Sequence, residues 1–187
     1  ITLILALSFL SYRLVFAVDQ GPFFPSTAVD DASIGTITWT NPGNVTASDN
    51  VYALISISTG ESSHYIKATN FGFSIPPGAT INGILVEWEV NSAGMTKDNA
   101  ALIVKGGSID PTSDRSNATT WIAIDTFLSH RSSSDLWGNT WTASDINSST
   151  FGAVLSAIKF TGGSPDTGRV DSVRITVSYT SAISISG

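Results

Sequence analysis

Short runs in which apolar and polar residues alternate constrain the fold of this chain more than any other feature of its sequence. In residues 81–90, large apolar side chains recur at every second position from Ile84 to Val90, and both glutamates of the run fall between them. Residues 169–180 repeat the pattern from Val173 to Tyr179. A period of two places successive side chains on opposite faces of a β-strand. The chain is therefore predicted to fold into sheets that bury one face.

Turn residues divide the rest of the chain into similar runs, with clear breaks at residues 41–43 and 76–78. This spacing is typical of a β-sandwich or a barrel. The predicted strands are residues 33–40, 51–58, 63–71, 81–90, 100–105, 119–128, 151–160 and 169–180. We expect the second and third of these to form a hairpin across a turn at residues 59–61. Residues 151–160 are apolar on both faces, which predicts a central strand.

One short helix is predicted near residue 142. Thr142 and Asp145 have the spacing of a capping box, and Ile146 begins the apolar side of the helical turn. The predicted fold class is all-β: a two-sheet antiparallel β-sandwich, jelly-roll-like, with about 8–9 strands and one short helix. No change in composition after Val18 indicates a linker, so residues 18–187 are predicted to form a single domain.

Residues 1–17 form a segment of different character. Residues 1–10 are nearly all apolar, a run too short to span a bilayer but suited to the hydrophobic core of a secretory signal. Val15 and Ala17 stand at the small-residue positions before a cleavage site. We therefore predict a targeting segment and a secreted, extracellular or virion-surface protein. The alternative is a retained N-terminal strand that pairs with a neighbouring subunit.

Charge and cysteine content argue against several functions. The net charge is −6, and no cluster of Lys or Arg offsets it, so nucleic acids and anionic membrane surfaces would be repelled. Membrane contact is expected only through the targeting segment. The chain has no cysteine, which removes disulfides, thiol catalysis and thiolate metal sites. No Gly-x-Ser-x-Gly elbow is present either. We predict a protein that is not an enzyme and carries no resident cofactor.

Three stretches carry a resemblance when taken in order: residues 71–84, residues 135–147 running into Phe151-Gly152, and residues 169–179. Together they resemble a β-sandwich module found in phage virion proteins and in secreted or surface proteins of bacteria. The resemblance covers residues 39–180 and departs from the expected pattern between Asp110 and Arg131. It implies the sandwich fold and an extracellular or virion setting, and it carries over no catalytic residue.

Two glutamates are the remaining candidates for catalysis. Glu87 and Glu89 share one face of a strand about 7 Å apart, a separation at which a glycoside hydrolase could divide its acid and nucleophile roles. The plainer interpretation is a solvated outer face opposite a buried Trp88. His64 and His130 have no partner at metal-binding spacing and are predicted to be surface residues.

Aromatic residues are the best candidates for binding. An indole has an apolar body and a polar edge, so an exposed Trp can stack on the face of a sugar. The candidate sugar-binding residues are Trp137, Trp141, Trp121 and Tyr65. The alternative is that at least one of Trp137 and Trp141 belongs to the core, because both stand in a stretch of turn residues that reads as architectural.

Aspartates in loops are candidate calcium ligands, because short carboxylates suit that ion. The positions concerned are Asp110, Asp114 and Asp166, with Asp30-Asp31 as a further place to look. The alternative is that these residues cap turns through hydrogen bonds to nearby backbone. Three sequons match the N-glycosylation pattern, at Asn44, Asn117 and Asn147.

Three functions follow, in order of preference. The first is a non-enzymatic structural or adhesive module, a subunit of an extracellular filament, a virion or a cell-surface array, which would associate with itself or with protein partners through strand edges. The second is a carbohydrate-binding, lectin-like module with a glycan as its partner. The third is a glycoside hydrolase that uses Glu87 and Glu89.

Overall fold

The computed structural model describes the backbone of residues 12–185 and the side chains of residues 17–181. Residues 1–11, most of the predicted targeting segment, lie outside the described residues. The described residues form ten strands in two sheets, one five-residue α-helix and one 3₁₀ turn, η1 (Pro42–Val45). The predicted all-β, two-sheet antiparallel sandwich is confirmed.

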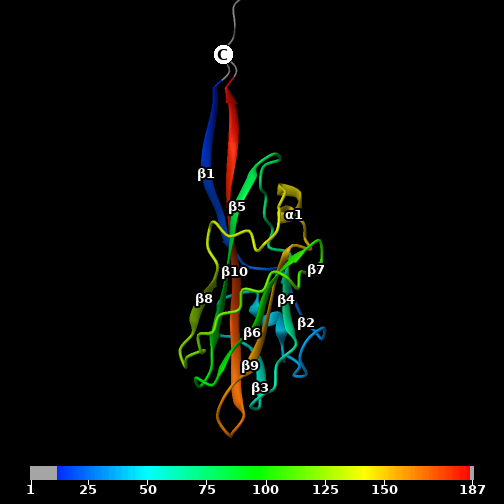
Figure 1. The fold of residues 1–187 in the computed structure, drawn as a ribbon, viewed down its shortest axis with the longest axis vertical. Coiled ribbons are helices and arrows are strands. Elements are labelled where there is room, and N and C mark those ends of the chain that lie inside the picture. The colour runs from blue at the N-terminus through cyan, green and yellow to red at the C-terminus, as the bar shows by residue number, and fades with distance from the viewer. Residues whose placement is uncertain (1–11, 186–187) are drawn as a thin grey trace, which may run out of the picture.

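Each sheet contains five strands (Figure 1). Sheet A consists of β1 (Tyr12–Phe23), β10 (Asp166–Ile185), β5 (Thr80–Asn91) and β8 (Thr126–His130) in that order, with β3 (Ala53–Ile57) paired to the first part of β10. Sheet B consists of β2 (Thr27–Asp31), β4 (Tyr65–Thr69), β9 (Gly152–Lys159), β6 (Thr96–Lys105) and β7 (Ser108–Ile109) in that order. Every pairing between these strands is antiparallel.

The strand order is that of a jelly roll. When β2 and β3 are set aside, the other eight strands give the order first, eighth, third, sixth in sheet A and second, seventh, fourth, fifth in sheet B. This arrangement is two interlocked Greek keys, which is the defining connectivity of the jelly roll. Strand β9 lies between β4 and β6, so the prediction of a central strand at residues 151–160 is confirmed.

The core lies between the two sheets and is made by the alternating residues. Ile84, Val86, Trp88 and Val90 of β5 are buried, as are the residues at every second position from Val173 to Tyr179 of β10. Inward residues of sheet B, such as Ile66 and Leu155, belong to the same apolar cluster. A second, smaller cluster lies on the outer face of sheet B, under the loops at its edges; its buried members are Tyr65, Ala100, Leu102, Val104 and Val154.

Two predictions about the first half of the chain are wrong. Residues 33–40 form no strand and make only isolated bridges at Ile37 and Thr40. Trp39 turns inward instead, where its amide donates to Asp30 of β2 and its indole donates to His64 O. The predicted hairpin across residues 59–61 does not form either. Strand β3 pairs with β10 in sheet A, whereas β4 pairs with β2 and β9 in sheet B, so this turn connects the two sheets.

The predicted helix is present as α1 (Ala143–Asn147). Its N-terminus is a capping box, in which Asp145 N–H donates to the Thr142 hydroxyl and Thr142 N–H donates to the Asp145 carboxylate. Ile146 is buried, as the apolar side of the turn predicted. The box confirms the spacing argument, with Asp in the place usually taken by Glu or Gln.

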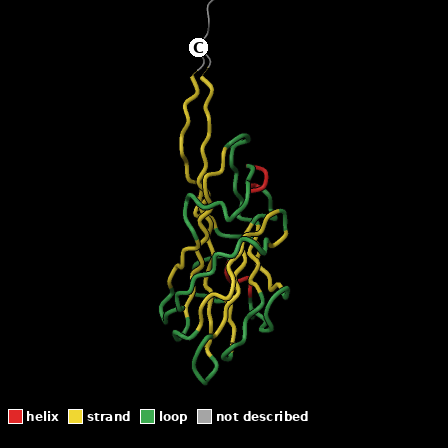
Figure 2. The backbone as a smooth tube through the Cα atoms, viewed as in Figure 1, coloured by secondary structure: helices red, strands yellow, loops and turns green. Residues whose placement is uncertain are grey.

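Strands β1 and β10 extend beyond the body of the sandwich as a two-stranded ribbon (Figures 1 and 2). The pairing of β10 with β5 ends at Thr180↔Thr80. The pairing of β10 with β1 continues for five more residue pairs, from Phe16↔Ser181 to Tyr12↔Ile185. Residues 12–16 and 181–185 are named here the terminal ribbon.

Candidate functional site

The terminal ribbon is the feature of the fold best placed to bind another molecule. Among the described strands, each of its two strands pairs only with the other, so each has one edge whose backbone N–H and C=O groups have no strand partner. A row of such groups is a template on which another chain can add a strand.

The sequence of the terminal ribbon lacks the usual protection of an exposed edge. Natural edge strands carry charged residues, proline or bulges that discourage pairing. The ribbon contains Tyr-Arg-Leu-Val-Phe and Ser-Ala-Ile-Ser-Ile, with Arg13 as its single charged residue and no proline. The bulge in β1, between Gln20 and Phe23, lies within the body of the sheet and not in the ribbon. A two-stranded ribbon is marginally stable by itself in water, so a partner strand would stabilise it.

The aromatic residues predicted to bind sugar are all buried. Trp137, Trp121, Tyr65 and Trp141 are between 0% and 9% exposed. All three indole N–H groups donate inside the protein. Trp137 donates to Ile84 O. Trp121 donates to Asp98 Oδ1, and Trp141 donates to Leu136 O. None of the three indoles therefore presents a ring face on which a sugar could stack. Tyr65 lies apart from them, on the outer face of sheet B.

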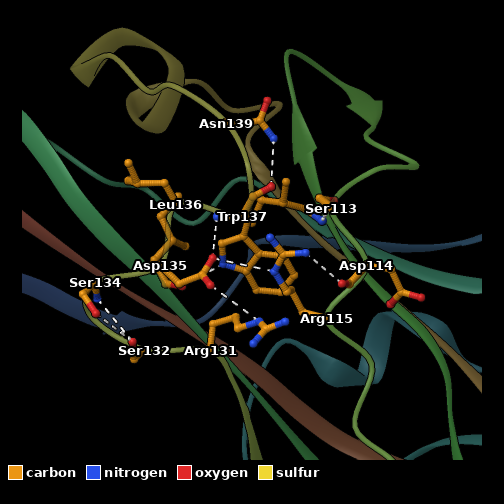
Figure 3. Close-up of polar contacts among 12 residues, drawn as sticks. Ser113, Asp114, Arg115, Arg131, Ser132, Ser134, Asp135, Leu136, Trp137 and Asn139 are labelled. Atoms are coloured by element: carbon orange, nitrogen blue, oxygen red, sulfur yellow. Dashed lines mark hydrogen bonds and ion pairs between the residues drawn. The ribbon is translucent and has the colours of Figure 1, made fainter.

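The loop around Trp137 holds sheet A through a set of polar contacts. Figure 3 shows the side chains of Arg115 and Arg131 converging on Asp135, whose carboxylate oxygens lie 3.7 and 3.6 Å from the two Nε atoms. Asp135 also accepts a hydrogen bond from Trp137 N–H, at 2.6 Å. The loop lies against β5 so closely that a Cβ on Gly83 would stand 2.2 Å from Ser133. These contacts give the Trp137 loop a structural role, which is to hold the loop against strand β5.

The three predicted calcium ligands serve as caps of loops. Asp110 accepts from Thr112 and from the Asn139 side chain. Asp114 accepts from the backbone N–H groups of residues 101 and 116, and buried Asp166 accepts from the Thr96 hydroxyl. Asp30 and Asp31 are likewise bonded to neighbouring residues. Within residues 12–185, no group of three or more His, Asp or Glu side chains is arranged to hold a metal ion.

The three sequons differ in whether the side-chain amide nitrogen of the asparagine donates a hydrogen bond within the protein. The Asn44 nitrogen donates to Tyr52 O, and the Asn147 nitrogen donates to Ile75 O. Asn117 uses its side-chain oxygen to accept from Thr119 N–H, and its nitrogen makes no hydrogen bond to the described part of the chain. Asn117 is thus the sequon whose amide nitrogen is best placed for modification.

Glu87 and Glu89 lie on the outer face of sheet A, as the alternation predicted. Glu87 forms a two-point ion pair with Arg174, at 2.8 and 3.1 Å. Glu89 accepts from the Ser172 hydroxyl, at 2.8 Å. Each carboxylate is thus bound to a residue of the neighbouring strand β10.

A third carboxyl group, which the sequence did not single out, lies beside Glu89. Asp171 stands at a bulge of β10 and is only 2% exposed, and its Oδ1 has no hydrogen-bond partner among the described residues. The pKa of Asp171 is raised to about 6, chiefly by burial and in addition by the nearby charge of Glu89 and a hydrogen bond with Glu89. The Asp171 carboxyl group is therefore protonated at mildly acidic pH.

The raised pKa of Asp171 predicts that folding is favoured by acid over a defined range. Because the folded state binds this proton more tightly than the unfolded state, the contribution is complete below about pH 4 and is lost as the pH rises through 6. Asp171→Asn should raise the unfolding free energy at pH 7.5 by about 1–3 kcal/mol and flatten its pH dependence between pH 4 and 7. Urea unfolding at pH 4.5 and 7.5 measures both, and a variant less stable than the wild type at pH 7.5 would contradict the assignment.

The prediction that both histidines are surface residues is wrong for His130. His130 is 1% exposed, because it lies on the inward face of β8, opposite the buried Val86. Its Nε2 lies 2.7 Å from Asp98 Oδ2. His64 is partly buried and lies 2.7 Å from Asp30 Oδ2. Each histidine thus has a carboxylate partner that is 32 or 34 residues away in sequence, which no local spacing could indicate.

Two comparisons of this chain with known proteins found no match. A scan against protein-family models found no match to this chain, and a search of curated proteins found none either. The resemblance to the phage and bacterial β-sandwich module therefore stays a prediction. In the described part of the chain, no helix has the length and apolar character needed to cross a membrane.

Proposed function

We propose that this chain is a non-enzymatic structural or adhesive module that assembles with further subunits by strand pairing at its terminal ribbon, in an extracellular filament, a virion or a cell-surface array. The observation that carries the proposal is the pair of strand edges in the terminal ribbon that have no partner among the described strands. Main-chain hydrogen bonds from an added strand supply affinity that does not depend on a deep pocket.

Removal of the predicted targeting segment would strengthen this role. Cleavage after Ala17 would remove β1 as far as the residue that pairs with Thr180. Residues 181–185 of β10 would then have both edges open, and a strand from a neighbouring subunit would fill the vacated place. Mass spectrometry of the mature N-terminus distinguishes the two forms: retention of Ile1 means that the chain presents the outer edge of β1, and an N-terminus at Val18 means that it presents β10.

Charges placed in the terminal ribbon should prevent assembly. Leu14 and Ile183 are cross-strand partners, so the double variant Leu14→Lys/Ile183→Lys puts two like charges opposite each other in the ribbon. We expect the wild type to form oligomers or filaments as its concentration rises, and the double variant to stay monomeric. Light scattering after size exclusion, with electron microscopy, measures this.

The matched control is Val51→Lys/Ile124→Lys, which places the same two charges on residues 52% and 72% exposed in loops outside the ribbon. This control should assemble as the wild type does. A wild type that stays monomeric at high concentration, or a ribbon variant that assembles as well as the control, would contradict the proposal.

A further inference from the structure

A cavity of about 470 Å³ lies on the outer face of sheet B, and Tyr65 and Asp31 are among the residues that line it. Its residues come from β2 and the loop after it, from β4, and from β7 with the turns on either side. They are Asp31, Ser33, Tyr65, Lys67, Gly107, Ser108, Ile109 and Pro111. We name this cavity the sheet B groove. Its volume is within the range of small-molecule sites, about 300–1,000 Å³.

The sheet B groove is held open by contacts within the protein. Tyr65 packs in the small apolar cluster on this face, with Val104 and Ile109 among its members. The ammonium group of Lys67 donates to Gly107 O at 2.8 Å, which ties β4 to the turn between β6 and β7. The opposite side of the groove is fixed by Asp31, whose Oδ1 accepts from the hydroxyl and the N–H of Ser33.

Several polar groups of the groove have bonding capacity left. Tyr65 is 7% exposed, yet its hydroxyl makes no hydrogen bond to a described residue, and the same is true of the Ser108 hydroxyl. Asp31 Oδ2 lies 3.8 Å from Lys67 Nζ, beyond hydrogen-bond distance, so this oxygen keeps acceptor capacity for a ligand hydroxyl. The Tyr65 hydroxyl does not belong to the buried polar atoms that lack a partner, so it opens onto the groove, where a ligand hydroxyl can reach it.

The charges around the groove select a neutral ligand. Hydrogen bonds from Ser33 lower the pKa of Asp31 against the effect of burial, so this group is a carboxylate acceptor at neutral pH. Burial raises the pKa of Tyr65, and the charges of Asp114 and Asp31 add to the effect, so the phenol stays a donor. The carboxylates of Asp31 and Asp114 would repel an anionic ligand, and the ammonium group of Lys67 would repel a cationic one.

We propose that the sheet B groove binds a neutral saccharide residue. Sugar hydroxyls both donate and accept, so neighbouring hydroxyls match the carboxylate of Asp31, the ammonium of Lys67 and the free phenol of Tyr65. The apolar sides of Ile109 and Pro111 suit the C–H face of a sugar ring. This inference does not depend on the terminal ribbon, and a glycan contact on a subunit that also assembles would make the assembly adhesive.

The test measures binding of a panel of neutral hexose and N-acetylhexosamine oligosaccharides, together with uronic-acid oligosaccharides, by saturation-transfer NMR and titration calorimetry. At least one neutral oligosaccharide should bind. Tyr65→Phe and Asp31→Asn should each weaken its Kd about tenfold, the effect of one lost hydrogen bond to a polar group. Tyr65→Phe keeps the packed ring, so its melting temperature should stay close to that of the wild type.

The matched control is Tyr179→Phe, which removes the hydroxyl of another tyrosine that is 7% exposed, in the main core. It should leave the Kd unchanged. Failure of every neutral oligosaccharide to bind, a preference for the uronic-acid members, or an unchanged Kd in both groove variants would overturn the proposal. None of these outcomes bears on assembly through the terminal ribbon, so the two proposals fail separately.

Discussion

Replacing Asp98 by alanine should lower the unfolding free energy by about 3–5 kcal/mol, the usual cost of breaking a buried polar pair. Asp98 stands at a bulge of β6 and is 5% exposed. Its carboxylate accepts from the Trp121 indole and from Asn117 N–H, and its Oδ2 lies 2.7 Å from His130 Nε2. The variant leaves the buried Trp121 indole and the buried His130 imidazole without this partner.

Chemical unfolding of Asp98→Ala measures this loss. The midpoint should fall while the slope with denaturant stays the same, because the surface exposed on unfolding is unchanged. Asp98→Asn keeps the shape and one acceptor oxygen and should lose less. The matched control is Asp114→Ala, which removes an exposed carboxylate from the nearby loop and should have a much smaller effect. Equal losses in the buried and exposed variants would contradict the stabilising role of the Asp98 contacts.

Replacing Trp137 by alanine should cost about 3–5 kcal/mol as well, the usual range for a buried Trp. Trp137 is fully buried, and its indole N–H donates to Ile84 O in the middle of β5 at 2.8 Å. The variant leaves a large cavity in the core and an unpaired carbonyl group in sheet A. Thermal unfolding should show a melting temperature lower by about 10 °C, since 1 kcal/mol corresponds to about 2–4 °C at this size.

Trp137→Phe separates packing from hydrogen bonding. It keeps most of the ring volume and removes only the donor, so it should lose about 1–2 kcal/mol. If Trp137 were a sugar-stacking residue, Trp137→Ala would lose glycan binding and keep its stability. An alanine variant as stable as the wild type would therefore contradict the architectural role.

The parts of the fold that the sequence predicted are those with a strict period of two. From Ile84 to Val90 of β5 and from Val173 to Tyr179 of β10, every second residue is large, apolar and buried, and the two runs pair directly, Val86 with Ile175 and Trp88 with Val173. Such a pattern has one register that buries its apolar face. The capping box at Thr142 is equally local, since both hydrogen bonds lie within four residues.

The predictions that were wrong concern segments whose structure depends on contacts with residues distant in sequence. Trp39 lies in a run that reads as a strand, but its amide and indole bind Asp30 and His64 O, which draws the chain into a loop. The turn at residues 59–61 has hairpin composition, yet β10 and β9 compete for the two strands beside it. Strand β7 has two residues, too few for any periodic signal.

The candidate sites were predictable only in part. The N-terminal segment was recognised as a strand that could pair with a neighbouring subunit, and the alternation indicated that Glu87 and Glu89 face outward. The pairing of those ends with each other joins Tyr12 to Ile185, which no local pattern could predict. Tyr65 was identified through its residue type, whereas its groove is assembled from segments between residues 31 and 111.

Hydrogen–deuterium exchange of the backbone amides in residues 181–185, at low and at high protein concentration, tests the assembly role most directly. If neighbouring chains add strands to the terminal ribbon, these amides should exchange quickly in dilute protein and become protected as concentration rises, while amides in the middle of β5 stay protected throughout. Exchange of residues 181–185 that is fast and identical at every concentration would contradict that role.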